Sequence, residues 1–176
     1  LAWLREQGHR WLGWLGAAAL RSYLQEEGFV SAADGEPRCD AVVLGVAPDQ
    51  VLGDLDRALG WLQHGADLLC LHRTGLWLDA DGRPRLGQGA WAAALTAAVP
   101  AARVVTAGKP EPAVYELALE SLGAKPEEAL FISDDPLTDL VGARRLGMAT
   151  VFVTSGKYPD MAVLSSLPPE LRPDLV

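Results

Sequence analysis

The stretch 108–156 constrains this chain most, because charged side chains stand where its predicted elements of secondary structure begin and end. Lys109 lies between Gly108 and Pro110, an amphipathic helix follows, and the apolar run 129–132 predicts a short strand. That strand ends on Ser133 and a group of acids, after which come a second helix and a second strand. The alternation predicts a parallel α/β sheet, and such sheets bind ligands outside the carboxyl ends of their strands.

The acids after this strand indicate a site for a divalent cation. Asp134, Asp135 and Asp139 lie close together in sequence and would repel one another without a cation. A hard ion such as Mg²⁺ takes oxygen ligands, and a lysine nearby would add positive charge for a phosphate. Asp135 directly precedes Pro136, and this order favours a helix N-cap as the role of Asp135.

Composition narrows the classes of partner. The chain has 176 residues, of which 49% are apolar, and its net charge is −8. That charge argues against nucleic acid and anionic membranes as partners. The sequence shows no membrane-spanning run and no secretion signal, so we expect a cytoplasmic protein. Cys39 and Cys70 lack metal-ligand spacing, and we expect two buried thiols.

Several motifs occur in the order found in the haloacid dehalogenase (HAD) superfamily of phosphohydrolases. In the second half they are Gly108-Lys109-Pro110, Asp134-Asp135 with Asp139, Gly142-Ala143, Gly147-Met148 and Ser155-Gly156-Lys157-Tyr158. Upstream, Asp40-Ala41-Val42-Val43 and Leu71-His72-Arg73 with Trp77 are similar to the cap of the NagD-like branch, class IIA. The resemblance covers almost the whole chain. It implies an α/β fold in which part of a three-layer HAD-like core, with a parallel sheet, carries an α/β cap.

The resemblance assigns a role to each residue of the core motifs. Lys109 is expected to bridge the phosphate and the nucleophile and to offset developing negative charge. Asp134 matches the metal-ligating aspartate, and Asp139 matches the second, supporting acid, which acts with Lys109 in catalysis. Gly108 lies in the substrate-binding turn. Ser133 departs from the usual glycine of the family and adds a Cβ close to the metal loop.

A loop of the cap is expected to face the active site and select the leaving group. There Arg73 would bind an anionic group of the substrate and Trp77 would stack on a ring. For His72 and Arg73 a purely structural role is equally consistent with the sequence. Trp61 and Trp91 lie on predicted cap helices, on a face through which relatives dimerise, so a homodimer through the cap is a further expectation.

The resemblance also divides the chain. Residues 1–99 are expected to form the cap, with residues 1–8 as a remnant helix leading into it, and residues 100–176 the C-terminal part of the core. Within the cap we expect a buried strand at 41–46 and a helix after it. Two further strands, at 67–72 and 75–78, are expected to be joined by a tight turn, and an alanine-rich helix covers 90–99.

The nucleophile of the family, an aspartate in a D-x-D motif ahead of the cap, is missing. Before Asp40 the only aspartate is Asp34, and it is not part of such a motif. The segment Asp79-Ala80-Asp81-Gly82 matches the D-x-D pattern, but it follows the cap strands and is typical of a hairpin turn. Similarly, residues 87–92 fit a dinucleotide fingerprint without the buried strand that must precede it, so a helix start is the better interpretation.

We therefore expect a Mg²⁺-dependent phosphatase that acts on a small phosphorylated metabolite through an aspartyl-phosphate. The chain itself is expected to lack the N-terminal part of the core, with its nucleophile, and to be inactive alone. The alternative is a complete, non-catalytic relative that binds a phosphorylated ligand or a partner. The sequence does not select among sugar phosphates, nucleotides and pyridoxal phosphate as substrates.

Overall fold

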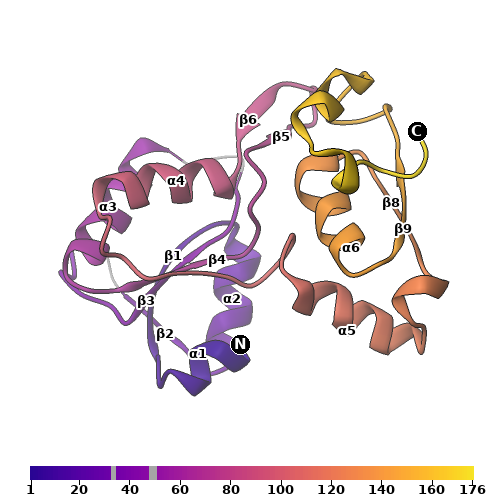
Figure 1. Cartoon of the computed structure of the whole chain (residues 1–176). Helices are drawn as coiled ribbons and strands as arrows, with labels where there is room; N and C mark the ends of the chain where they lie inside the picture. The colour runs from indigo at the N-terminus through magenta and orange to yellow at the C-terminus, as the bar shows by residue number, and fades with distance from the viewer. Residues whose placement is uncertain (33–34, 48–50) are drawn as a thin grey trace.

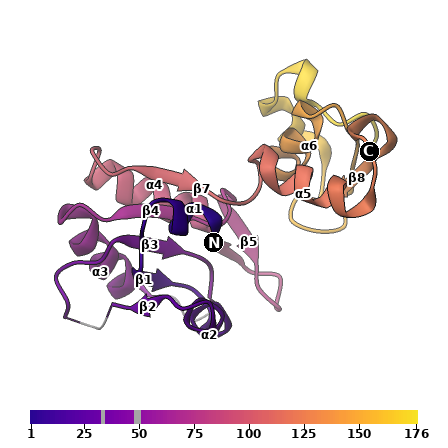
Figure 2. The ribbon, with the colours of Figure 1, turned by 90° about the horizontal axis from the view of Figure 1, so that it is seen from below.

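The computed structural model describes residues 1–32, 35–47 and 51–176, which form two α/β regions (Figure 1). We call residues 1–106 the first region and residues 107–176 the second region. Figure 2 shows the two regions side by side, joined by the segment between β7 and α5. Asp34 lies outside the described residues.

The first region is a parallel sheet between two layers of helices. Across the sheet the strands are β2 (Val30–Ser31), β1 (Trp11–Leu15), β3 (Ala41–Leu44), β4 (Asp67–Cys70) and β7 (Val104–Thr106). One face is covered by α3 (Leu52–Gln63) and α4 (Gln88–Ala98), and the other by α1 (Ala2–Glu6) and α2 (Ala18–Glu26) (Figure 1).

Alternation along β3 shows how the sequence builds this sandwich. Val42 and Leu44 belong to the apolar cluster under α3 and α4, whereas Ala41 and Val43 belong to the cluster on the α1 and α2 side. All four side chains are buried. A continuous apolar run is typical of a parallel strand covered on both faces, and the expected buried strand is confirmed.

The first sheet extends beyond residue 99, where the sequence had placed the end of the cap. β7 pairs with β4, with Leu68 opposite Val104 and Cys70 opposite Thr106. Val104 packs against the cluster under α3 and α4, and Val105 packs against the opposite cluster. The strand is apolar toward both layers, so it completes the first sheet and the break between sheets falls after Thr106.

A hairpin leaves the end of the first sheet and reaches toward the second region (Figure 1). Its strands β5 (Leu76–Leu78) and β6 (Pro84–Leu86) pair antiparallel, so the strand expected at 75–78 is joined by its tight turn to β6 and not to the strand at 67–72. In the turn, the Asp79 carboxylate accepts from the N–H groups of Asp81 at 3.0 Å and Arg83 at 2.9 Å. The turn interpretation of the D-x-D-G letters is confirmed. α4 begins directly after Gly87, and this confirms the helix start there.

The second region contains a two-stranded parallel sheet and a layer of helices. Its elements are α5 (Pro112–Leu122), η1 (Pro126–Glu128), β8 (Leu130–Ser133), η2 (Pro136–Leu140), α6 (Val141–Arg145), β9 (Ala149–Phe152), η3 (Met161–Ser166) and η4 (Pro169–Leu171). Tyr115 of α5 anchors the layer, because its hydroxyl donates to the Asp139 carbonyl at 2.8 Å. An added Cβ at Gly142 of α6 would lie 2.3 Å from that hydroxyl, so the close packing of the two helices requires glycine at this position.

One face of β8 is apolar and exposed. Leu130 is 55% exposed and Ile132 is 59% exposed, while Phe131 between them packs against the helix layer. Parallel sheets are normally covered on both faces, so this face has the character of an interface.

The burial of the tryptophans and cysteines can be compared with the expectations from sequence. Trp61 is only 3% exposed and its indole N–H donates to the Glu36 carbonyl at 2.8 Å, so this tryptophan is part of the core and not of a dimerisation face. Trp91 is partly buried against the same core. Cys39 and Cys70 are buried free thiols, as predicted. Among the described residues, no helix is long and apolar enough to cross a membrane.

Gly13 of β1 lies against the Trp61 ring, and this contact gives a stability prediction. An added Cβ would stand 2.4 Å from two ring carbons. We expect Gly13→Ala to lower the free energy of unfolding by about 1–3 kcal/mol through overpacking, measured by chemical denaturation. The control is Gly60→Ala on α3, where nothing lies within 4 Å of the new Cβ. That variant should be neutral or slightly stabilising, and equal losses for both would contradict the packing argument.

The exposed face of β8 gives a second prediction. We expect the chain to self-associate through this face, and Ile132→Lys to shift it toward monomer in light scattering, because a charge there opposes apolar contact. Leu122→Lys is the matched control, since Leu122 is 74% exposed on α5, the helix that packs on the Phe131 side of β8 and not on its exposed face. A chain that is monomeric without either substitution would overturn the prediction.

Candidate active site

The acids that follow β8 are fixed by a short helix. Asp135 is the N-cap of η2, and its carboxylate accepts from the N–H groups of Leu137 and Thr138, both at 3.2 Å. Pro136 occupies the first helical position, where its missing N–H costs nothing. The predicted role of Asp135 as a helix N-cap is confirmed. This N-cap sets the direction in which the neighbouring acids leave the strand.

Lys109 and Asp139 meet in an ion pair. The Lys109 Nζ lies 2.5 Å from Asp139 Oδ2, and the hydroxyl of Ser133 donates to the same oxygen at 3.0 Å. The lysine comes from the turn after β7 and the acid from η2, so the sequence separation of 30 residues is closed by the fold. The structure therefore brings together a cation and an acid that sequence spacing had linked.

Asp139 is ionised in this setting. Burial by itself favours the neutral acid, but hydrogen bonding with His72 and the charge and hydrogen bond of Lys109 outweigh it and hold the pKa of Asp139 below its usual value. Its Oδ1 is buried, and His72 Nε2 faces it at a long 3.4 Å. His72 Nδ1 accepts the N–H of Thr74 at 2.9 Å, so the proton of the neutral ring is on Nε2, facing Asp139.

Asp134 rests on the loop that follows β9. Its Oδ2 accepts the backbone N–H of Lys157 at 2.7 Å. A Cβ on Gly156 would lie 2.0 Å from that same oxygen. Glycine is thus required at 156 by the position of the carboxylate. A carboxylate has about four lone-pair positions, so Asp134 keeps capacity for a further ligand.

A second ion pair joins Lys157 to Asp135, with 2.7 Å between Nζ and Oδ2. Both side chains are nearly buried, at 9% and 8% exposure. Burial favours the neutral acid, but hydrogen bonds from Lys157 and Thr138 hold the pKa of Asp135 below its usual value. The Lys157 ammonium also donates to the Thr74 hydroxyl of the first region, and that hydroxyl lies 3.2 Å from Asp135 Oδ2.

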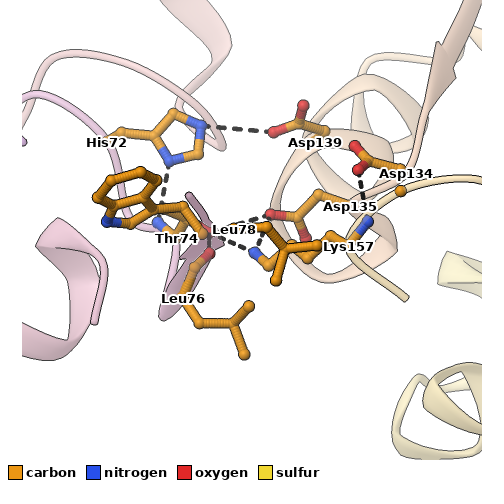
Figure 3. Close-up of a pocket in the computed structure, with 10 residues that line it drawn as sticks. His72, Thr74, Leu76, Leu78, Asp134, Asp135, Asp139 and Lys157 are labelled. Carbon is orange, nitrogen blue, oxygen red and sulfur yellow. Dashed lines mark hydrogen bonds and ion pairs between the residues drawn. The ribbon is translucent and has the colours of Figure 1, made fainter. Parts of the chain in front are cut away.

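These groups line one pocket of about 350 Å³ between the two regions (Figure 3). Figure 3 shows His72 and Thr74 on one side, facing Asp134, Asp135 and Asp139 on the other. The full lining is His72, Thr74, Leu76, Trp77, Leu78, Asp134, Asp135, Asp139, Gly156 and Lys157. The pocket thus combines three acids of the second region with hydrogen-bond donors from both regions. This arrangement is suited to a phosphate bound together with a cation.

The residues predicted from sequence divide into three groups. Asp134, Asp139, His72 and Trp77 line the pocket, and Lys109 reaches it through its pair with Asp139. Gly108 packs on the first region, because a Cβ there would lie 2.1 Å from the Leu71 carbonyl oxygen. The Arg73 side chain is exposed and is not among the lining residues, although its backbone N–H donates to the Lys109 carbonyl at 3.1 Å.

Thr74 and Lys157 were missed as site residues. Lys157 follows β9, and the rule that ligands gather at the carboxyl ends of parallel strands applies to β9 as it does to β8. That signal was available in the sequence. Thr74 gave no such signal, because a threonine in a loop is common and only the packing of the two regions brings it to Asp135.

The donor set fits Mg²⁺ in part. Mg²⁺ keeps several waters and is often bound by only one or two carboxylates with substrate phosphate, and Asp134 supplies one such oxygen. Within the described ranges, no group of three or more histidine, cysteine or acidic side chains is arranged to hold a metal. If such an ion binds here, Asp134 would supply one of its oxygen ligands and the other positions would be filled by water or substrate.

Comparison with known proteins agrees with this geometry. A family model described as HAD-hydrolase-like matches residues 106–176. The human haloacid dehalogenase-like hydrolase domain-containing protein 2 is 38% identical over 120 residues, which are 68% of this chain and 46% of that protein. The chain thus spans about half the length of the curated relatives it matches.

Solved structures share the fold. NagD from Escherichia coli K-12 superposes with a TM-score of 0.71 at 23% identity, covering 99% of this chain and 65% of that one. A glycerol phosphate phosphatase from Mycobacterium tuberculosis, solved in complex with magnesium, gives a TM-score of 0.74 at 26% identity and covers 96% of this chain and 50% of that one. The chain is a member of the HAD superfamily. Its fold resembles that of NagD.

The contact between the Asp134 carboxylate and the Gly156-Lys157 peptide can be tested directly. We expect Gly156→Ala to displace the carboxylate, so that the Lys157 amide proton loses a charge-assisted hydrogen bond and moves upfield in the NMR spectrum. Gly60→Ala, far from the pocket, should leave that resonance in place. An unchanged Lys157 resonance in Gly156→Ala would show that the described position of Asp134 is wrong.

Proposed function

We propose that this chain forms the substrate-binding and metal-binding side of a Mg²⁺-dependent phosphomonoester hydrolase of the cytoplasm. Its substrate class is a small phosphorylated metabolite. The observation that carries the proposal is the pairing of Lys109 with Asp139 beside Asp134, in one pocket that the first region closes with His72 and Trp77. The phosphatases among its relatives and structural neighbours support it.

Lys109 is proposed to offset charge on the phosphoryl group. In the structure its ammonium is held by Asp139, and Ser133 shares the same carboxylate oxygen. This holds the ammonium in one place before substrate arrives, and a preorganised charge stabilises a transition state without reorganisation at the moment of reaction. Asp139 is thereby a supporting acid that positions the lysine.

Asp134 is proposed as the chain's metal ligand. Bound Mg²⁺ would supply charge neutralisation at the phosphoryl oxygens. The Lys157 N–H holds one oxygen of Asp134 at 2.7 Å, so the carboxylate is oriented before any ion binds. Fixed orientation of a ligand by an outer hydrogen bond raises metal affinity.

The first region is proposed to act as the cap. His72 and Trp77 lie over the pocket from that side and would exclude water and contact the leaving group. The exposed Arg73 would contribute by attracting anionic substrates. Gly108 would let the Lys109 turn approach the Leu71 backbone closely. A homodimer through the cap remains part of the proposal, with the exposed Leu52 and Leu86 as surface available for it.

Attack on phosphorus is proposed to use an aspartate of a D-x-D motif, which displaces the substrate alcohol and forms an aspartyl-phosphate. Water then hydrolyses this intermediate, releasing inorganic phosphate and restoring the aspartate. The sequence before Asp40 has no such motif, and Asp79 is bound in a hairpin turn. We therefore propose that the chain alone does not turn over substrate. These two observations also favour a second candidate, a module that binds a phosphorylated ligand in the same pocket without hydrolysing it.

The assay that separates the candidates is hydrolysis of p-nitrophenyl phosphate with Mg²⁺, by the chain as given and by any longer natural form that contains it. In an active form, Lys109→Ala should lower kcat by about a hundredfold or more, as loss of a preorganised donor does. Asp134→Asn should raise the Mg²⁺ concentration needed for half-maximal rate, because an amide contributes less charge to a hard cation.

Asp79→Asn is the control, since its carboxylate serves the hairpin turn, and it should leave kcat unchanged. If Asp79→Asn abolished turnover while Asp134→Asn kept it, the assignment of cap and core would be reversed. Phosphate binding by calorimetry with no turnover in any form would select the binding module.

A further inference from the structure

Lys157 touches three parts of the pocket at once. Its backbone N–H donates to Asp134, its ammonium pairs with Asp135 at 2.7 Å, and the same ammonium donates to the Thr74 hydroxyl. Asp134 and Asp135 belong to the second region and Thr74 to the first. Figure 3 shows the lysine between the acids and the Thr74 side of the pocket.

These contacts fall where the two regions meet. Thr74 and His72 lie on one loop after β4, and each faces an acid of the second region: Asp135 at 3.2 Å from the Thr74 hydroxyl and Asp139 at 3.4 Å from His72 Nε2. The Lys157 and Asp135 side chains are each less than a tenth exposed, so their pair is little screened by solvent. A buried pair is strongly disfavoured with one partner gone, so its geometry is restrictive.

We propose that Lys157 is a positioning residue that couples the placement of the first region to the orientation of Asp134. A single residue carries the coupling, because its main chain contacts Asp134 and its side chain contacts Thr74. When Thr74 binds the ammonium, the loop at Lys157 is held from the first region, and its N–H is held against Asp134. When Thr74 leaves, the loop loses that restraint and so does the carboxylate.

The glycine next to Lys157 supports this interpretation. Gly156 gives the Asp134 oxygen room to lie against the peptide. The Lys157 ammonium also lies over the Tyr158 ring, 5.4 Å from its centroid, and this contact restricts the lysine further. The Asp134 carboxylate therefore rests on a loop whose position depends on the other region. The metal part of this inference rests on the proposed function, whereas the contact between regions does not.

Two threonines make a matched test. The Thr74 and Thr138 hydroxyls both reach Asp135 Oδ2, but Thr74 belongs to the first region and Thr138 to η2 of the second. Replacing either by valine removes one hydroxyl from the same carboxylate. Only Thr74→Val removes a contact between regions.

The distance between regions is measured by electron paramagnetic resonance on the full chain, with spin labels on Ala19→Cys of α2 and Glu116→Cys of α5, both exposed positions. Cys39 and Cys70 are buried. We expect one narrow distance distribution for the otherwise unchanged chain and for Thr138→Val, and a broader or longer one for Thr74→Val and Lys157→Met. Thr74→Ser keeps the hydroxyl and should restore the narrow distribution.

Identical distributions for Thr74→Val and Thr138→Val would overturn the coupling. A thermal melt identifies unfolding in Lys157→Met, and in that case Thr74→Val and Thr74→Ser decide the matter. The second arm is Mg²⁺ titration by calorimetry. Thr74→Val should weaken Mg²⁺ binding about tenfold, the range seen for outer contacts of a ligand, although Thr74 does not touch Asp134.

The two arms fail separately. If the unsubstituted chain binds no Mg²⁺ while the distance distributions behave as expected, the metal role of Asp134 in the proposed function is wrong and the contact between regions stands. If Mg²⁺ binds and Thr74→Val changes neither its affinity nor the distance, Lys157 serves the second region alone and the inference is wrong.

Discussion

The site depends on keeping three carboxylates close together in a partly buried place. Burial alone would push Asp135 and Asp139 toward their neutral forms. Lys157 and Thr138 hold the pKa of Asp135 below its usual value, and His72 and Lys109 do the same for Asp139. Lys157 and Lys109 reach these acids from segments more than twenty residues away. Removing a partner from a buried pair such as Lys157–Asp135 costs about 3–5 kcal/mol, whereas the Lys109–Asp139 pair is more exposed to solvent. Asp134 differs, because it is held by a backbone N–H and keeps acceptor capacity.

Local sequence signals predicted much of the second region. An apolar strand ending on acids, a proline after Asp135 and a lysine in a Gly-Pro turn each have a direct physical meaning, and the strand, the N-cap and the Lys109–Asp139 contact are in the structure. The rule for strand ends would also have found Lys157. What these signals have in common is that each acts within a few residues or through the topology of a parallel sheet.

Contacts that depend on tertiary packing could not be predicted from local sequence signals. β7 is a short apolar strand, and its sequence does not say whether it joins the sheet before it or the sheet after it. The resemblance placed Trp61 on a dimerisation face of the cap helices, but Gly13 of β1 leaves the space in which its ring is buried. Thr74 becomes part of the site only because two regions meet at the pocket. In each case the missing information is the identity of a distant neighbour.

The β5–β6 hairpin has a consequence for how such a pocket can diversify. Its strands pair with each other, and Asp79 closes its turn from within. It carries Trp77 to the pocket while the five-stranded sheet keeps its own hydrogen bonds. Substitutions or changes of length at the hairpin tip therefore leave the acids and their lysines untouched. In the proposed function, substrate preference would vary on this hairpin while the charged centre of the pocket stays constant, so selectivity could evolve separately from the proposed phosphate and metal chemistry.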